Sequence, residues 1–181
     1  MTQLPQSRMR LADLPTNRPS QFTLAPNAAA RKAIAQHLAI VGIKKLTFQG
    51  SLAPLGKSDW ALSAKLGATV VQDCVVTLAP VTTRIDEPII RTYMAEIPEI
   101  DAAEVEMALD EAIDPLPDSL DVALVMIEAL SLALPPYPRA EDAALGSAAF
   151  SAPGVAPMTD DDAKPFAGLG SLRESLEKKD E

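Results

Sequence analysis

The sequence predicts an α+β protein with a mostly antiparallel sheet packed by two main helices, and with flexible N- and C-terminal segments. Three observations lead to this fold class. Runs that alternate between apolar and polar residues predict strands, and the short connections between them favour antiparallel pairing. Apolar residues at helical spacing predict helices at residues 27–41 and 119–134. Residues 139–165 lack any core period and are rich in Ala, Pro, Gly and Asp, which indicates an exposed linker.

The chain of 181 residues is long enough for one domain with its own core and for additional segments. We expect a flexible N-terminal segment at 1–21, a single α+β domain at 22–147, and an acidic linker with a short C-terminal docking segment at 148–181. A closed or half-closed barrel is the alternative to an open sheet. The single cysteine and the lack of an apolar run near the ~20 residues of a membrane span lead us to expect a cytoplasmic protein.

The first helix is expected to begin at Asn27 and to end before Gly42, a residue type that readily takes the left-handed conformation after a helix. Its apolar face is predicted to consist of Ala30, Ile34, Leu38 and Val41. Residues 44–52 then alternate as a half-buried strand, and residues 54–58 form a turn. That turn contains Gly-Lys-Ser but lacks the first glycine of a phosphate-binding loop, which excludes this type of nucleotide site.

Further strands are predicted where the alternation resumes, at residues 60–66, 68–73, 81–85 and 89–94. Gly67 is expected to mark a bulge or bend, and Pro88 is expected to interrupt the last of these strands. The acidic residues 95–118 show no clear pattern.

The second helix, at 119–134, is the most apolar stretch of the chain and is expected to be capped by Asp118 or Ser119. Pro135 and Pro136 prevent its continuation. Its core face is predicted to contain Leu120, Leu124, Ile127 and Leu130. A charge placed at Leu124 is therefore expected to unfold the domain.

The charge is distributed unevenly along the chain. Residues 1–94 hold 11 Lys+Arg against 5 Asp+Glu, whereas residues 95–181 hold 5 against 20, so the net charges are +6 and −15. One interpretation is an acidic protein with solvated carboxylates. The other is a polar molecule with a basic face for RNA and an acidic face for a basic protein.

No pattern of catalytic or metal-binding residues emerges from the sequence. His37 and Cys74 are the only residues of their kinds, and Asp73 is expected to raise the pKa of Cys74. The acids at 160–162 lack the spacing of a calcium loop, and no RNA-recognition aromatic motif, KH loop or zinc finger is present. We therefore expect no enzyme activity, no metal and no cofactor.

Several motifs appear in a recognisable order. QDCVVTLAPVTTRIDEPI is followed by EAIDPLPDSLDVALVMIEALSLALPPYPRAEDA and then by a terminal KPFAGLGSLRESL. Over roughly residues 22–176 the chain resembles the YceD family, the large ribosomal RNA subunit accumulation proteins. The most specific motif consists of Ile113, Asp114, Glu128, Leu130, Leu132, Ala133, Leu134 and Pro135, with 165–172 as independent support.

Members of that family often carry a Cys-x-x-Cys pair where this chain has Cys74, and further cysteines after the second helix. Here Thr77 occupies the second position and residues 139–146 contain no cysteine. Two cysteines form the minimal arm of a tetrahedral zinc site, so this chain cannot build one.

The resemblance implies a non-enzymatic factor needed for accumulation of large-subunit (23S) ribosomal RNA in the bacterial cytoplasm. Its expected partner is large-subunit rRNA or a pre-ribosomal particle, contacted directly or through a basic protein. Neither a membrane nor DNA is expected as a partner. The RNA-binding candidates are Arg31, Lys32, Lys44, Lys45, Lys57 and Lys65. The candidates for binding a basic protein are Glu104, Glu106, Asp110, Glu111, Asp114, Glu128, Phe166 and Leu169. The alternative is an acidic protein-interaction adaptor with no RNA role.

Overall fold

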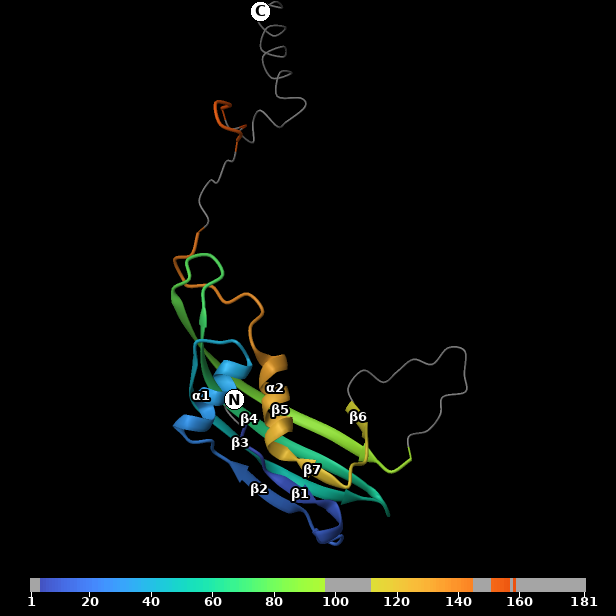
Figure 1. The fold of residues 1–181 in the computed structure, drawn as a ribbon. Coiled ribbons are helices and arrows are strands. Elements are labelled where there is room, and N and C mark those ends of the chain that lie inside the picture. The colour runs from blue at the N-terminus through green and yellow to red at the C-terminus, as the bar shows by residue number, and fades with distance from the viewer. Residues whose placement is uncertain (1–3, 97–111, 145–150, 157, 159–181) are drawn as a thin grey trace, which may run out of the picture. The chain divides into compact units, whose positions relative to one another are not determined.

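The computed structural model describes residues 4–96, 112–144, 151–156 and 158. The chain separates into two compact units, 1–143 and 144–181. All the helices and strands of the described residues lie in the first unit (Figure 1). In chain order they are β1 (Arg8–Arg10), the 3-10 turn η1 (Leu11–Asp13), β2 (Ser20–Leu24), α1 (Ala28–His37), β3 (Gly42–Leu55), β4 (Asp59–Asp73), β5 (Pro80–Met94), β6 (Ala112–Pro115), β7 (Ser119–Asp121) and α2 (Val122–Ala133).

The main sheet has five strands in the order β2-β3-β4-β5-β6. Its pairs are antiparallel except for β5 and β6, which run parallel. β1 and β7 form a separate antiparallel ribbon. The predicted α+β class is confirmed, and the sheet is open rather than closed into a barrel.

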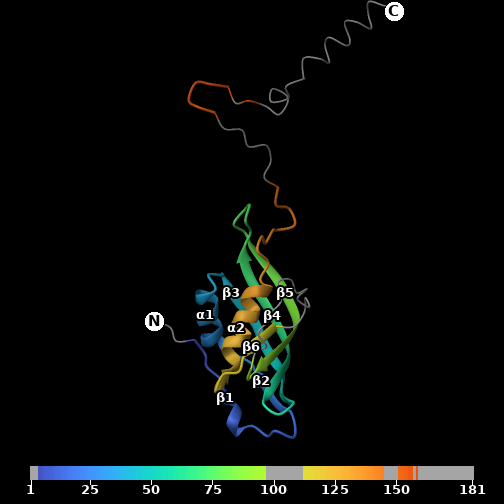
Figure 2. The same cartoon turned by 90° about the vertical axis from the view of Figure 1, so that its right-hand side faces the viewer.

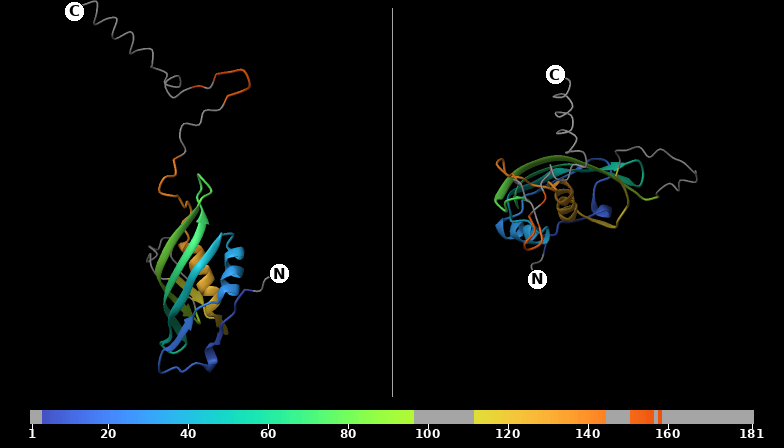
Figure 3. Two further views of the ribbon diagram at one scale, coloured as in Figure 1. Left: turned by 90° about the vertical axis from the view of Figure 1, so that its left-hand side faces the viewer. Right: turned by 90° about the horizontal axis from the view of Figure 1, so that it is seen from above.

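Both helices lie on the concave side of the curved sheet, as the view from above in Figure 3 shows. Figure 2 shows α2 running along the middle strands, with α1 on the same side. The core fills the space between helices and sheet. Its fully buried side chains include Phe48, Leu52, Leu62, Leu66 and Val70 from the sheet, and Ile34, Val122, Met126 and Leu130 from the helices.

The first helix begins at the predicted place, and the side chain of Asn27 caps it by accepting a hydrogen bond from the Ala30 N–H at 2.9 Å. It ends earlier than predicted. Ala39, and not Gly42, takes the left-handed conformation with φ of 52°, and Gly42 begins β3. Val41 is consequently exposed, which contradicts its predicted place on the buried face.

The second helix starts three residues later than predicted, because residues 119–121 pair with β1 instead. Asp121 is its N-cap and accepts a hydrogen bond from the Ala123 N–H at 3.0 Å. The prediction that Leu124 is buried is wrong: 59% of its surface is exposed, whereas Leu130 is completely buried. The other members of the predicted face, Leu120 and Ile127, are buried. The buried residues of the helix are Val122, Ala123, Val125, Met126, Ile127, Ala129 and Leu130.

The sheet strands are longer than the sequence predicts. β4 runs without a break through Gly67, and β5 runs through Pro88. Proline is tolerated there because β6 pairs only with residues 91–94 of β5, so within the described part of the chain no strand pairs with Pro88 on that side. Gly67 is therefore neither a bulge nor a bend.

Candidate nucleic-acid interface

The convex side of the sheet carries a polar surface that neither helix covers in the described part of the chain (Figure 3). Side chains alternate between the two faces of a strand, so the residues between the buried ones point to this side. We call this surface the open sheet face. It consists of the outward residues at the centre of β3, β4 and β5, namely Lys44, Lys45, Thr47, Gln49, Lys65, Gly67, Thr69, Thr82, Arg84 and Asp86.

A β-bulge brings two consecutive lysines to this face. The register of β3 against β4 shifts between Ile43 and Lys45, so Lys44 and Lys45 are both exposed instead of pointing in opposite directions. Lys44 Nζ donates to the Thr82 hydroxyl on β5 at 3.0 Å, which fixes its side chain over the open sheet face. Lys45 pairs with Thr69.

The strand register places the remaining charges close to these lysines. Thr69 stands between Lys45 and Arg84, and Lys65 lies on the same face of β4. Neighbouring strands are about 4.8 Å apart, so side chains in one row are near neighbours. The open sheet face therefore combines four cations with a single carboxylate, Asp86, and is basic.

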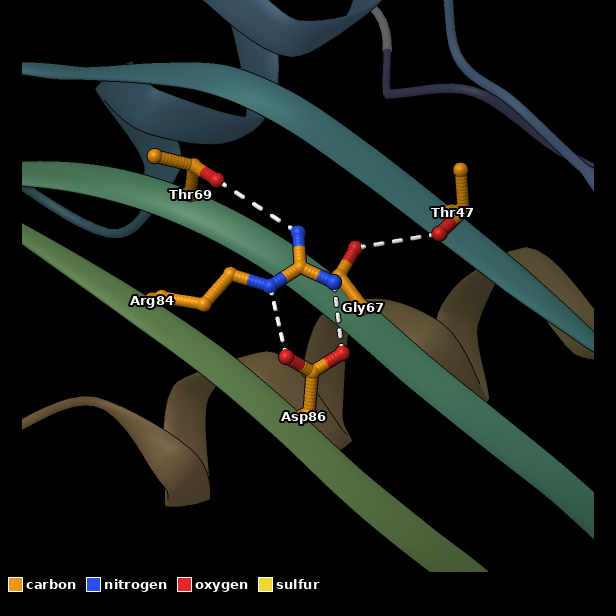
Figure 4. Close-up of polar contacts among 5 residues, drawn as sticks. All are labelled: Thr47, Gly67, Thr69, Arg84 and Asp86. Atoms are coloured by element: carbon orange, nitrogen blue, oxygen red, sulfur yellow. Dashed lines mark hydrogen bonds and ion pairs between the residues drawn. The ribbon is translucent and has the colours of Figure 1, made fainter.

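Arg84 is held flat in the middle of this surface (Figure 4). Its Nε and NH2 groups donate to the two carboxylate oxygens of Asp86 at 2.6 and 2.5 Å, and NH1 lies 3.5 Å from the Thr69 hydroxyl. The hydrogen bonds from Arg84 hold the pKa of the Asp86 carboxyl below its ordinary value, and the charges of Arg84 and Lys65 act in the same direction. Both groups consequently stay charged.

Gly67 makes room for this pair. A Cβ atom at this position would lie 2.9 Å from the Thr47 hydroxyl and 3.0 Å from Arg84 NH2. Without it, a shallow hollow of about 190 Å³ opens on the face. Its lining consists of Thr47, Gln49, Lys65, Gly67, Arg84 and Asp86.

Of the six cations predicted to bind RNA, the structure gathers Lys44, Lys45 and Lys65 on one surface. Arg31 instead donates to the backbone carbonyls of Ile43 at 3.2 Å and Pro26 at 2.8 Å, and so anchors α1 to the chain around it. Lys32 also lies on α1, and Lys57 lies in the turn between β3 and β4.

Arg84 was missed by sequence reasoning. The alternation of Val81, Thr83 and Ile85 predicts that Arg84 lies on the opposite, solvated face of the strand. This alternation is the sequence signal that could have identified Arg84.

Two of the predicted acidic partner-binding residues form an internal ion-pair cluster. Arg91 NH2 lies 2.9 Å from Glu128 Oε1, and Arg91 NH1 lies 3.6 Å from Asp114 Oδ2. These contacts join β5 to α2 and β6. The other candidates, Glu104, Glu106, Asp110, Glu111, Phe166 and Leu169, lie outside the described residues.

Cys74 lies in the turn that follows β4, where its sulfur accepts hydrogen bonds from several groups. The backbone N–H groups of Val76, Thr77 and Ala140 each lie 3.4 Å from Sγ. The side-chain hydrogen bond from Thr77 is the largest of the effects that lower the pKa of Cys74 from 9.0 to about 6, and burial opposes them. The expectation that Asp73 raises this pKa is therefore wrong, because hydrogen bonds to the sulfur dominate.

This pKa predicts a pH-dependent stability. The folded protein stabilises the Cys74 thiolate more than the unfolded chain does. The thiolate therefore adds to the free energy of unfolding in full above about pH 9, and this contribution is lost as the pH falls through about 6. We expect the urea midpoint of the wild type, measured under reducing conditions, to rise between pH 6 and 9 more than that of Cys74→Ser, which has no thiol to titrate. Parallel pH profiles for the two proteins would contradict a thiolate in the folded state.

Among the described residues, no three His, Cys, Asp or Glu side chains come together in a way that could hold a metal ion. The helices of the same residues are too short or too polar to cross a membrane.

Comparison with known proteins identifies a family. No curated protein and no solved structure matches the chain. The family model described as "Large ribosomal RNA subunit accumulation protein YceD" matches residues 62–173, more than half of the chain. The matched part includes most of β4 and all of β5, β6, β7 and α2. Arg84, Asp86, Gly67 and Lys65 all lie within the matched part. The match confirms the resemblance found in the sequence, and the chain belongs to the YceD family of large ribosomal RNA subunit accumulation proteins.

Proposed function

We propose that this protein supports the accumulation of large-subunit (23S) ribosomal RNA by binding the RNA directly on its open sheet face, without catalysing a reaction. The observation that carries the proposal is the gathering of Lys44, Lys45 and Lys65 around the Arg84–Asp86 pair, on a surface that neither helix covers. Clustered cations bind phosphates by releasing counterions, and such binding is strong at low salt. We also propose that the protein acts in the bacterial cytoplasm.

The charge of the whole chain makes the position of these cations important. At a net charge of −9 the protein as a whole repels RNA. A local basic surface attracts phosphates only where it is separated from most of the carboxylates, because salt screens charges beyond about 8 Å. On β4 the carboxylates Asp59 and Asp73 stand at the two strand ends, and the single cation of the strand, Lys65, lies near its middle.

Reversing charge on the open sheet face tests this function. We expect Lys44→Glu/Lys45→Glu to reduce the affinity for a large-subunit rRNA fragment at least about 100-fold at low salt, and to flatten the dependence of the binding constant on salt concentration. The control is Lys32→Glu/Lys57→Glu, which changes the net charge equally but elsewhere on the protein. Binding is measured by filter retention across a salt series, after melting curves have shown that both variants are folded.

The same variants decide between direct RNA binding and the adaptor alternative in cells. Depletion of the protein is expected to lower the ratio of large- to small-subunit rRNA. Wild type and the control variant should restore the ratio, whereas Lys44→Glu/Lys45→Glu should not. If the wild type fails to bind RNA at low salt, direct binding is refuted and an adaptor role is favoured.

A further inference from the structure

The hydrogen-bonding edge of Arg84 is already occupied. Three of its nitrogens face Asp86 and Thr69, and the two charges of the pair neutralise each other. The Nε and NH2 groups form one of the two edges with which an arginine can clamp a phosphate through parallel hydrogen bonds, and Asp86 occupies it. Arg84 is therefore a poor phosphate clamp, and the surrounding lysines are better suited to that role.

What Arg84 does present is a flat surface. Figure 4 views the guanidinium group face-on with the strands running across the picture, so its plane lies along the sheet. One side rests over Gly67, where NH2 occupies the direction that a Cβ atom would take. The side chains of Arg84 and Asp86 remain 52% and 43% exposed, which leaves the other side of the plane open to solvent.

We propose that Arg84, held flat by Asp86 and Gly67, is a stacking platform for an unpaired nucleobase, and that this protein prefers single-stranded RNA to duplex. This inference rests on the proposed function and adds the kind of RNA to it. Guanidinium planes stack on bases in RNA recognition, but the base faces in a duplex are covered by their neighbours. Stacking tolerates any base, so the preference concerns structure rather than sequence.

The surrounding residues suit a single strand that passes over the platform. Lys45 lies in the same row as Arg84, with Thr69 between them, and Lys65 lines the hollow beside Asp86. Cations in both places can contact the phosphates that flank a stacked base. Thr47 and Gln49 supply uncharged polar groups along the same hollow.

The test uses full-length protein, a 12-nucleotide unstructured RNA and a duplex of the same length. We expect wild type to bind the single strand more tightly. Arg84→Lys keeps the positive charge but has no plane, so affinity for the single strand should fall about tenfold while the salt dependence stays unchanged. Duplex binding should not change. The fluorescence of a 2-aminopurine base in the single strand should change when wild type binds, because the base leaves its neighbours for Arg84, and should not change with saturating Arg84→Lys.

Gly67→Ala provides a second variant that leaves every charge in place. Its Cβ would meet side-chain atoms of Thr47, Arg84 and Asp86 and no backbone atom among its three nearest neighbours, so we expect the fold to be retained while the platform is tilted. Gly67→Ala should show the same selective loss of single-strand binding and of the 2-aminopurine fluorescence change. Agreement between the two variants identifies the flat guanidinium, rather than its charge, as the feature that binds.

Other outcomes separate this inference from the function on which it rests. If Arg84→Lys binds the single strand like wild type while Lys44→Glu/Lys45→Glu fails to bind, the platform is refuted and direct RNA binding stands. Equal affinity of wild type for single strand and duplex also refutes the platform. If wild type binds neither RNA, both proposals fall, and the open sheet face is then better explained as a surface for an acidic protein.

Discussion

Leu130→Asp is expected to unfold the first structural unit. Leu130 is completely buried in α2, packed in the core with Val122, Val125 and Met126. A carboxylate there would have no cation partner, and an unpaired buried charge costs several kcal/mol, which is comparable to a total stability of about 5–15 kcal/mol. The fluorescence of Trp60, the single tryptophan, reports the result, because this side chain is buried and its emission shifts to the red when the unit unfolds.

Leu124→Asp is the matched control on the same helix. Leu124 is mostly exposed and is the third residue of α2, where an acidic side chain interacts favourably with the positive end of the helix dipole. We expect its free energy of unfolding to stay within about 1 kcal/mol of wild type. If Leu124→Asp unfolds the protein and Leu130→Asp does not, the buried face of α2 is assigned incorrectly.

The contrast between these two leucines shows where sequence reasoning reached its limit. Apolar residues surround α2 on most sides, so the pattern predicted a buried helix but could not select its face. The buried face is set by the packing of α2 against the sheet, and the first residue of the helix is set by the pairing of β7 with β1. That pairing joins residues more than 100 positions apart, and both strands are three residues long, which is too short for a detectable period.

The strands of the main sheet were easier to predict, because one face of each is buried and the other is solvated. The alternation of Leu46, Phe48 and Leu52, and of Trp60, Leu62 and Leu66, matches the residues buried in the structure. The antiparallel arrangement followed from the short connections. The continuity of β5 through Pro88 did not follow, since it requires knowing that this part of the strand lies at a sheet edge.

The candidate interface could be predicted only in part. Composition indicated a basic first half and identified Lys44, Lys45 and Lys65 among six cations. It could not show that these three share a face, because strict alternation puts Lys44 opposite Lys45 and only the bulge unites them. The position of the Arg84–Asp86 pair over Gly67 depends on the register of β5 against β4. This register cannot be predicted from the sequence of either strand alone.

Gly50→Ala is expected to destabilise the sheet by at least about 3 kcal/mol, at the upper end of the usual cost of overpacking. Gly50 lies in β3 between Phe22 of β2 and Ala64 of β4. A Cβ atom there would lie only 2.3 Å from the Ser63 carbonyl oxygen and 2.5 Å from Ala64 Cα. These are backbone atoms of the neighbouring strand, so no side chain can rotate away and the two strands must separate.

Gly42→Ala is the control for this substitution. Gly42 is at the start of the same strand, has no atom within 4 Å of an added Cβ, and does not have a positive φ. We expect its melting temperature to stay close to that of wild type, whereas Gly50→Ala should melt roughly 10 °C lower. The difference would show that β3 and β4 approach each other closely at this point because Gly50 lacks a side chain. Equal melting temperatures for the two variants would contradict that close approach.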